Sequence, residues 1–116
     1  MIEAMSNDRL PTRLWVDAHL SVLTMAGTPF YIHNTGNYDS GIVLVKINGY
    51  GEGCKLLQQQ RSLDGEMGWM ALMNGEVVAE PEADAYIARA IDRDPDLWVI
   101  EVEDKEMKNP FEGKVF

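Results

Sequence analysis

The chain has 116 residues, of which 46% are hydrophobic and 25% charged, the composition of a single globular domain. A chain of this length can bury a core without disulfides or a structural metal, and its one cysteine, Cys54, cannot form an internal disulfide. No apolar run approaches the ~20 residues of a membrane span, and the N-terminus has no signal-peptide pattern. We therefore expect a cytoplasmic protein that does not associate with membranes.

The net charge of −9 is unevenly distributed along the chain. Residues 76–106 contain eleven acids and three bases, so this part alone carries −8. A nucleic-acid backbone would be repelled there, which disfavours nucleic-acid binding. The acidic surface is either a solvated face that aids solubility or a docking surface for a protein partner.

Hydrophobic periodicity and turn residues predict two helices and five strands. The helices are expected over residues 10–26 and from just after Pro81 to just before Pro95. The expected strands are residues 29–34, 41–48, 54–61, 67–73 and 97–102. Turn-forming segments separate the first four strands, and residues 34–41 in particular have the composition of a hairpin loop. The first four strands are therefore expected to form an antiparallel meander.

The order α-β-β-β-β-α-β predicts a single α+β domain, a mainly antiparallel sheet of four to five strands with two helices against it. Residues 41–48 are apolar on both faces except at Lys46, so this strand should be central. The last strand joins the sheet either at an edge or between two earlier strands. Residues 1–8 are polar and aperiodic and are expected to be disordered, and residues 9–116 form the domain.

The first helix is apolar around most of its circumference, which indicates burial on more than one side. Either a second subunit supplies part of that burial, or the sheet and a loop of the same chain cover the helix. The first alternative predicts a homodimer. Its interface candidates are Trp15, Val16, His19, Leu20 and Leu23.

Five sequence blocks occur together in the chain: RLPTRLWVDA (residues 9–18), GIVLVKIN (41–48), RSLDGEMGWM (61–70), ADAYIARAIDRDPDLWVIEVED (83–104) and NPFEG (109–113). With these blocks the chain resembles, over about residues 9–115, the alphaproteobacterial domain of unknown function family numbered 1491. The resemblance implies a small, single-domain bacterial protein. It brings no established activity, cofactor or catalytic residue.

One motif suggests a metal-dependent nuclease but does not meet the geometric requirement. Asp96, Glu103 and Lys105 follow the PD…ExK order of such enzymes. The two carboxylates flank a single strand, and seven residues at ~3.3 Å each separate them by roughly 23 Å, too far to share one metal ion. We interpret the motif as a coincidence.

Other metal and nucleophile candidates have little support. A calcium loop beginning at Asp92 would require glycine where Leu97 stands. His19 and His33 are isolated from other metal ligands, so we expect core or interface histidines. Cys54 has no histidine nearby in the sequence, and a buried, inert thiol is expected. We therefore predict no metal and no other cofactor.

Two functions from different classes remain open. The first is a non-enzymatic protein-interaction or regulatory module that acts as a small homodimer through its acidic face or its first helix. The second is a small-molecule binder or hydrolase with a site between sheet and helix, where an arginine holds an anionic ligand. Such a site requires a concavity with convergent polar groups. The ligand-binding candidates are Arg13, Asp17, Arg61 and Arg89.

Overall fold

The computed structural model describes residues 10–116, so the predicted disordered segment, residues 1–8, lies outside the described part of the chain. The helices and strands are α1 (Thr12–Ala26), β1 (Phe30–Asn34), β2 (Val43–Asn48), β3 (Cys54–Arg61), β4 (Met67–Ala71), the short 3-10 helix η2 (Met73–Gly75), α2 (Glu80–Arg93) and β5 (Trp98–Glu103). The predicted order α-β-β-β-β-α-β is confirmed.

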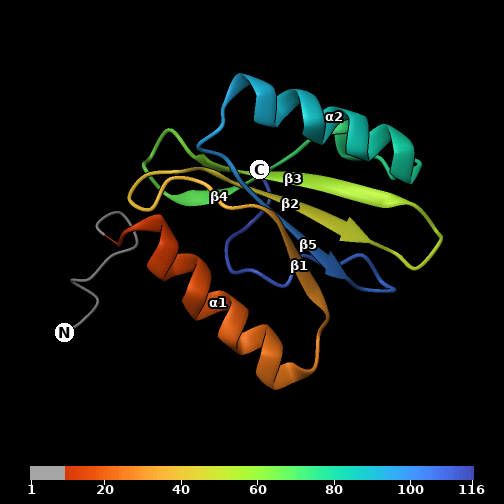
Figure 1. Ribbon diagram of the computed structural model, residues 1–116, viewed down its shortest axis with the longest axis horizontal. Helices are drawn as coiled ribbons and strands as arrows, with labels where there is room; N and C mark the ends of the chain where they lie inside the picture. Colours follow the sequence, from red (N-terminus) through yellow and green to blue (C-terminus); the bar gives the residue numbers. More distant parts are fainter. Residues whose placement is uncertain (1–9) are drawn as a thin grey trace.

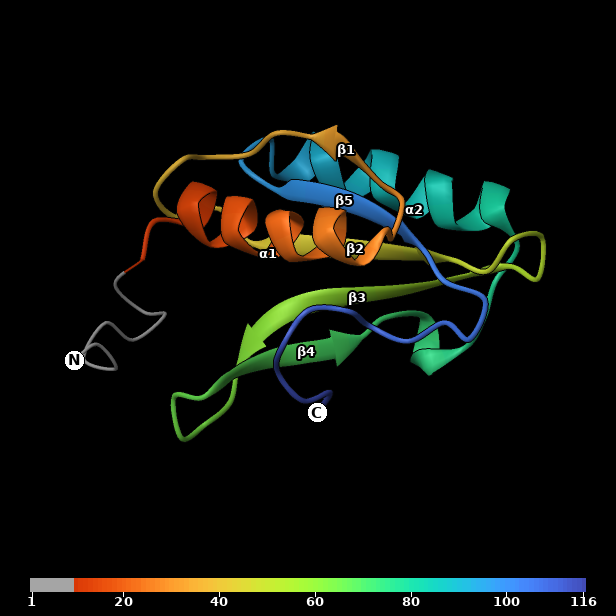
Figure 2. The ribbon, with the colours of Figure 1, turned by 90° about the horizontal axis from the view of Figure 1, so that it is seen from below.

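The five strands form one mixed sheet in the order β1-β5-β2-β3-β4. Neighbouring strands are antiparallel except β2 and β5, which are parallel. Helix α1 packs on one face of the sheet and α2 on the other (Figure 1). Seen from the α1 side, the segment after β5 runs past β3 and β4 to the C-terminus (Figure 2). The prediction of an α+β fold with a mostly antiparallel sheet is confirmed.

The prediction that residues 34–41 form a hairpin loop is wrong, because β5 lies between β1 and β2. The meander is confined to β2, β3 and β4. Hydrophobicity explains the insertion of β5. Five of its six residues are buried, whereas three of the five residues of β1 are exposed. A strand that is apolar on both faces is stable only at a position covered on both faces, and the partly exposed strand β1 is left at the edge.

The sheet separates two hydrophobic layers. On the α1 face, Trp15 lies 6.2 Å from Trp69 and 5.7 Å from Phe111 between ring centroids, so the C-terminal segment closes this layer. On the other face, Ala83 and Ile87 of α2 belong to a second buried cluster. None of the helices in residues 10–116 has the length and apolar character needed to cross a membrane.

Candidate functional site

A cleft opens where β2 and β3 separate. Pairing of β2 with β3 ends at Leu44 and Gln58, whereas β3 stays paired with β4 as far as Arg61 and Met67. The chain before β2 turns toward α1 instead of continuing the ladder. It is held there by the Thr12 hydroxyl, which donates to the carbonyl oxygen of Gly41 at 2.9 Å.

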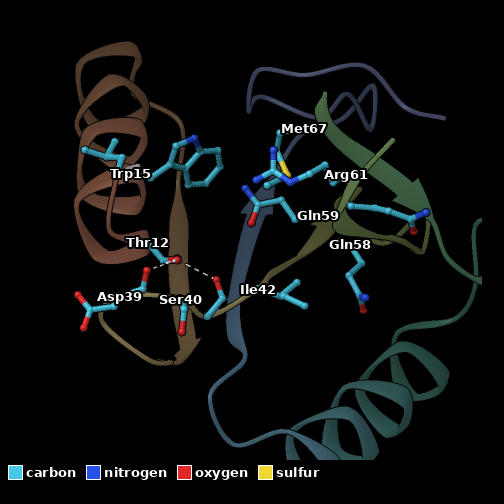
Figure 3. Close-up of a pocket in the computed structure, with 12 residues that line it drawn as sticks. Thr12, Trp15, Asp39, Ser40, Ile42, Gln58, Gln59, Arg61 and Met67 are labelled. Carbon is cyan, nitrogen blue, oxygen red and sulfur yellow. Dashed lines mark hydrogen bonds between the residues drawn. The ribbon is translucent and has the colours of Figure 1, made fainter. Parts of the chain in front are cut away.

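The resulting cleft has a volume of about 510 Å³. It lies between the start of α1, the loop before β2 and the last residues of β3. Figure 3 shows Trp15 on one side and Gln59, Arg61 and Met67 together on the other. Its lining consists of Leu10, Thr12, Trp15, Asp39, Ser40, Gly41, Ile42, Gln58, Gln59, Gln60, Arg61 and Met67.

Two side chains of β3 supply the polar wall of the cleft. The side-chain oxygen of Gln59 accepts a hydrogen bond of 3.3 Å from the backbone N–H of Val43, and so replaces the ladder bond lost where the strands separate. Arg61 donates from Nη1 to the carbonyl oxygen of Gly65 at 2.8 Å, which fixes its guanidinium group to the β3–β4 turn. Alternate residues of a strand share a face, so Gln59 and Arg61 are presented side by side.

The opposite wall is the indole of Trp15, which is 5% exposed. The ring is stacked on His19, with 4.0 Å between ring centroids, and is held from behind by the aromatic cluster with Trp69 and Phe111. The cleft therefore combines a rigid aromatic wall with a guanidinium group, the two features that recognise an apolar group carrying a carboxylate.

Of the four predicted ligand-binding residues, only Arg61 lines this cleft. Arg13 and Asp17 form an exposed ion pair on the outside of α1, with 3.2 Å between Nε and Oδ2. Arg89 is exposed on α2, on the other face of the sheet. Thr12 and Gln59 were not among the predicted site residues, and Trp15 was predicted only as an interface residue. Gln59 lies two residues before Arg61 on the same strand, whereas Thr12 and Trp15 belong to α1, which no local pattern places beside the end of β3.

The predicted interface candidates are mostly covered by their own chain. Trp15, Val16, Leu20 and Leu23 are buried against the sheet. His19 is partly buried and donates from Nδ1 to the carbonyl oxygen of Trp15 at 2.8 Å. The sheet and the C-terminal segment of the same chain thus bury these four residues, and their burial does not require a second subunit.

A second polar cluster lies on the α2 face of the sheet. Lys46 is 2% exposed, and its Nζ lies 2.8 Å from Glu80, 2.7 Å from Asp84 and 3.5 Å from Glu101. Lys46 and Glu101 are direct partners in the parallel pairing of β2 and β5. The sequence contains the signal for this pair, a single lysine in one apolar strand and a single glutamate in another, since buried charges must be paired.

Hydrogen bonds hold Glu101 in its charged form. Nε2 of His33 donates to Oε1 at 2.5 Å and Nδ2 of Asn48 donates to Oε2 at 2.9 Å. Burial raises the pKa of Glu101, but these donors and the charge of Lys46 outweigh burial and lower the pKa below its usual value. Burial also disfavours the charged form of Lys46 and lowers its pKa. The carboxylates of Asp84, Glu80 and Glu101 together have the larger, opposite effect, so the pKa of Lys46 lies above its usual value and the ammonium stays charged.

The lowered pKa of Glu101 predicts a pH dependence of folding. A carboxyl group whose pKa is lower in the folded state stabilises the fold above its unfolded pKa, and that contribution is lost as the pH falls through the folded pKa. We expect the thermal midpoint of the wild type to fall more on acidification from pH 7 than that of Glu101→Gln. Parallel curves for the two proteins would contradict this role of Glu101. Calorimetric scans at constant ionic strength make the comparison.

The remaining motifs do not form a chemical centre in the described part of the chain. Asp96 precedes β5 and Glu103 ends it, so the two carboxylates of the nuclease-like motif lie at opposite ends of one strand. Within residues 10–116, no group of three or more histidine, cysteine or acidic side chains is arranged to hold a metal ion. Cys54 is buried as expected, and burial raises the pKa of its thiol.

The fold and the cleft define a class of protein, a small α+β domain with a polar cleft between its first helix and the separated strands. The chain belongs to the DUF1491 family, described as a protein of unknown function, which it matches over residues 10–112. The coarse prediction from the sequence blocks, membership of this family, is confirmed. No curated protein matches the chain.

Three solved structures share the fold. A crystal structure of a DUF1491 family protein from Caulobacter crescentus is 33% identical and has a TM-score of 0.82, with 92% of this chain and 99% of that chain covered. An NMR structure of a DUF1491 family protein from Caulobacter crescentus is also 33% identical, with a TM-score of 0.79 and coverage of 93% and 97%. The solution structure of protein Atu0922 from A. tumefaciens is 22% identical, with a TM-score of 0.71 and coverage of 89% and 92%, and shows the fold alone.

Proposed function

We propose that the protein is a ligand-binding module whose cleft takes a small anionic ligand, a carboxylate attached to a planar or apolar group. The observation that carries the proposal is the position of Arg61 in the wall of a concavity of about 510 Å³. Sites for small molecules typically have volumes of about 300–1,000 Å³. The concavity beside a candidate arginine is the feature that the ligand-binding hypothesis required.

The hydroxyl groups of the cleft favour binding over hydrolysis by a serine or threonine nucleophile. A nucleophilic serine needs a general base within hydrogen-bond reach. Ser40 instead donates its hydroxyl to the side-chain oxygen of Asn37 at 3.3 Å, and an amide oxygen does not act as a base. The Thr12 hydroxyl is engaged with the carbonyl of Gly41. We therefore assign Arg61 and Gln59 to ligand recognition and Trp15 to the apolar wall.

Calorimetric titration with phenylacetate tests the recognition by charge. We expect weak binding to the wild type, with a dissociation constant of about 1 mM, and at least tenfold weaker binding to Arg61→Gln, because a charge-assisted hydrogen bond contributes about 1.5–3 kcal/mol. The matched control is Arg13→Gln, which changes the net charge equally but lies outside the cleft. Phenylacetamide has the same shape without the charge. It should bind to all three proteins more weakly than phenylacetate binds to the wild type.

Two outcomes would contradict the proposal. Equal weakening by Arg13→Gln would show that only the overall charge of the protein matters. Equal affinity of the wild type for phenylacetamide and phenylacetate would show that Arg61 does not recognise the carboxylate.

The other function predicted from the sequence, a protein-interaction or regulatory module that acts as a homodimer, stays a second proposal. It is supported by apolar side chains that α1 leaves exposed, Leu14 at 43%, Val22 at 61% and Met25 at 87%. These are different residues from the predicted interface candidates. A protein partner at the acidic face of residues 76–106 is also retained as a proposal, because −8 of the net charge lies there.

We further propose a bacterial, alphaproteobacterial source and a cytoplasmic location. The relative from Caulobacter crescentus supports the source. The single, buried cysteine fits a reducing compartment. Fractionation of cells that express the native gene, with detection by antibody, tests the location, and recovery outside the cytoplasmic fraction would contradict it.

A further inference from the structure

Helix α1 carries an apolar stripe on the side that faces away from the sheet. The stripe consists of Leu14, Ala18, Val22 and Met25, all of them exposed. At 3.6 residues per turn, these four positions fall within an arc of about 80° and extend over roughly 17 Å along the helix. We propose that this stripe is the contact between two copies of the chain, related by a two-fold axis close to Ala18; the inference rests on the second proposed function, the homodimer, and names its interface.

The stripe is separate from the part of α1 that holds the fold together. Trp15, Val16, Leu20 and Leu23 face the sheet and are buried. One helix therefore presents two apolar sides, one used within the chain and one left uncovered in the described structure. This explains why α1 is apolar around most of its circumference although a surface helix normally needs only one apolar side.

The charge distribution favours a second copy as the occupant. The only charged side chains within α1, Arg13 and Asp17, neutralise each other at 3.2 Å. The strongly acidic residues 76–106 include all of α2, which lies on the opposite face of the sheet (Figure 1). Two chains of net charge −9 can approach through α1 while their acidic helices stay apart. A basic protein partner, by contrast, would be attracted to the α2 face.

A two-fold arrangement also fits the sizes of the side chains. When two antiparallel helices meet at Ala18, the Leu14 of each chain faces the Val22 of the other, because contacts across a two-fold axis are reciprocal. The small side chain of Ala18 lets the helices approach at the axis. A contact of one helix per chain is smaller than the ~1,600 Å² of a standard interface, so the expected dimer is weak.

Sedimentation velocity of the full chain tests the proposal. We expect the wild type to shift from monomer to dimer as its concentration rises through about 10–500 µM, the range of a small interface. Added salt should strengthen the dimer by screening the repulsion between two acidic chains. Val22→Glu should stay monomeric throughout. Leu63→Glu, which adds the same charge at a fully exposed position of the β3–β4 turn, should dimerise like the wild type.

A cysteine pair test places the axis and does not depend on the folding of Val22→Glu. Mild oxidation should cross-link Ala18→Cys into a disulfide-bonded dimer, because the two introduced thiols meet at the axis, and should leave Val22→Cys largely uncross-linked. A wild type that stays monomeric at 500 µM would overturn the proposal. Dimers of Val22→Glu as strong as those of the wild type, or equal cross-linking of the two cysteine variants, would overturn it as well.

Discussion

Replacing Lys46 by methionine should lower the free energy of unfolding by about 3–5 kcal/mol, the cost of removing one partner from a buried ion pair. The Nζ of Lys46 lies within 3.5 Å of three carboxylates, and Glu101 is itself only 6% exposed. Without the ammonium group, Glu101 is left charged and buried while Glu80 and Asp84 of α2 lose their attachment to the sheet. Urea unfolding followed by circular dichroism measures the change.

Two controls separate the buried charge from charge in general. Lys108→Met removes a lysine whose side chain is 77% exposed and should leave the unfolding curve unchanged. The double variant Lys46→Met with Glu101→Gln removes both buried charges and should recover part of the lost stability, because the two residues are coupled. This account would be contradicted if Lys46→Met lowered the free energy of unfolding by less than 1 kcal/mol. It would also be contradicted if the loss in the double variant equalled the sum of the losses in the two single variants.

Replacing Trp15 by alanine should lower the free energy of unfolding by about 3–5 kcal/mol, as expected for deletion of a large buried side chain. The indole is 5% exposed and fills the space between α1, Trp69 of β4 and Phe111 of the C-terminal segment. The same change removes one wall of the cleft. We therefore expect phenylacetate binding to be lost at temperatures where Trp15→Ala is still folded.

The matched control for Trp15→Ala is Val22→Ala on the same helix. Val22 is 61% exposed, and its truncation should change stability by no more than about 0.5 kcal/mol. Thermal unfolding of the monomer at low concentration compares the two variants. Equal effects of the two substitutions would mean that α1 is not held against the sheet by its Trp15 side.

The element types and their order were predictable because local patterns determine them. The first helix, expected over residues 10–26, is observed over Thr12–Ala26, and its C-cap is Gly27, whose φ of 76° is in the left-handed region that favours glycine. The second helix was expected to start just after Pro81 but begins at Glu80 and includes Pro81, since proline is tolerated in the first turn. Within the apolar residues 41–48, Val43–Asn48 form a central strand.

The place of β5 could not be decided from the same patterns. An apolar strand with turn residues before it can join the sheet at an edge or between two earlier strands. The second arrangement requires that two strands consecutive in the sequence do not pair with each other. The exposed residues of β1, Tyr31 to His33, show which strand was left at the edge. The pairing of Lys46 with Glu101 follows from that choice, because the parallel register of β2 and β5 brings the two together.

The candidate site was predictable only in part. A site between sheet and helix with an arginine that holds an anion was one prediction, and of the candidate arginines Arg61 does line a cleft. The other walls come from α1 and from the loop before β2, segments separated from Arg61 by more than fifteen positions in the sequence. Their approach depends on the separation of β2 from β3 before Leu44 and after Gln58, which no local pattern signals.

The most direct test of the proposed cleft function is the location of a bound carboxylate. In an NMR titration of the 15N-labelled full chain with phenylacetate, the three tryptophan indole N–H signals serve as reporters. Those of Trp69 and Trp98 are hydrogen-bonded to the carbonyl oxygens of Glu112 and Asn37, respectively, and neither residue lines the cleft. We predict that the signals of the Trp15 indole and the Gln59 side-chain amide shift with saturation, and that both responses are lost in Arg61→Gln. Shifts confined to α2, or an unchanged response in Arg61→Gln, would contradict the account.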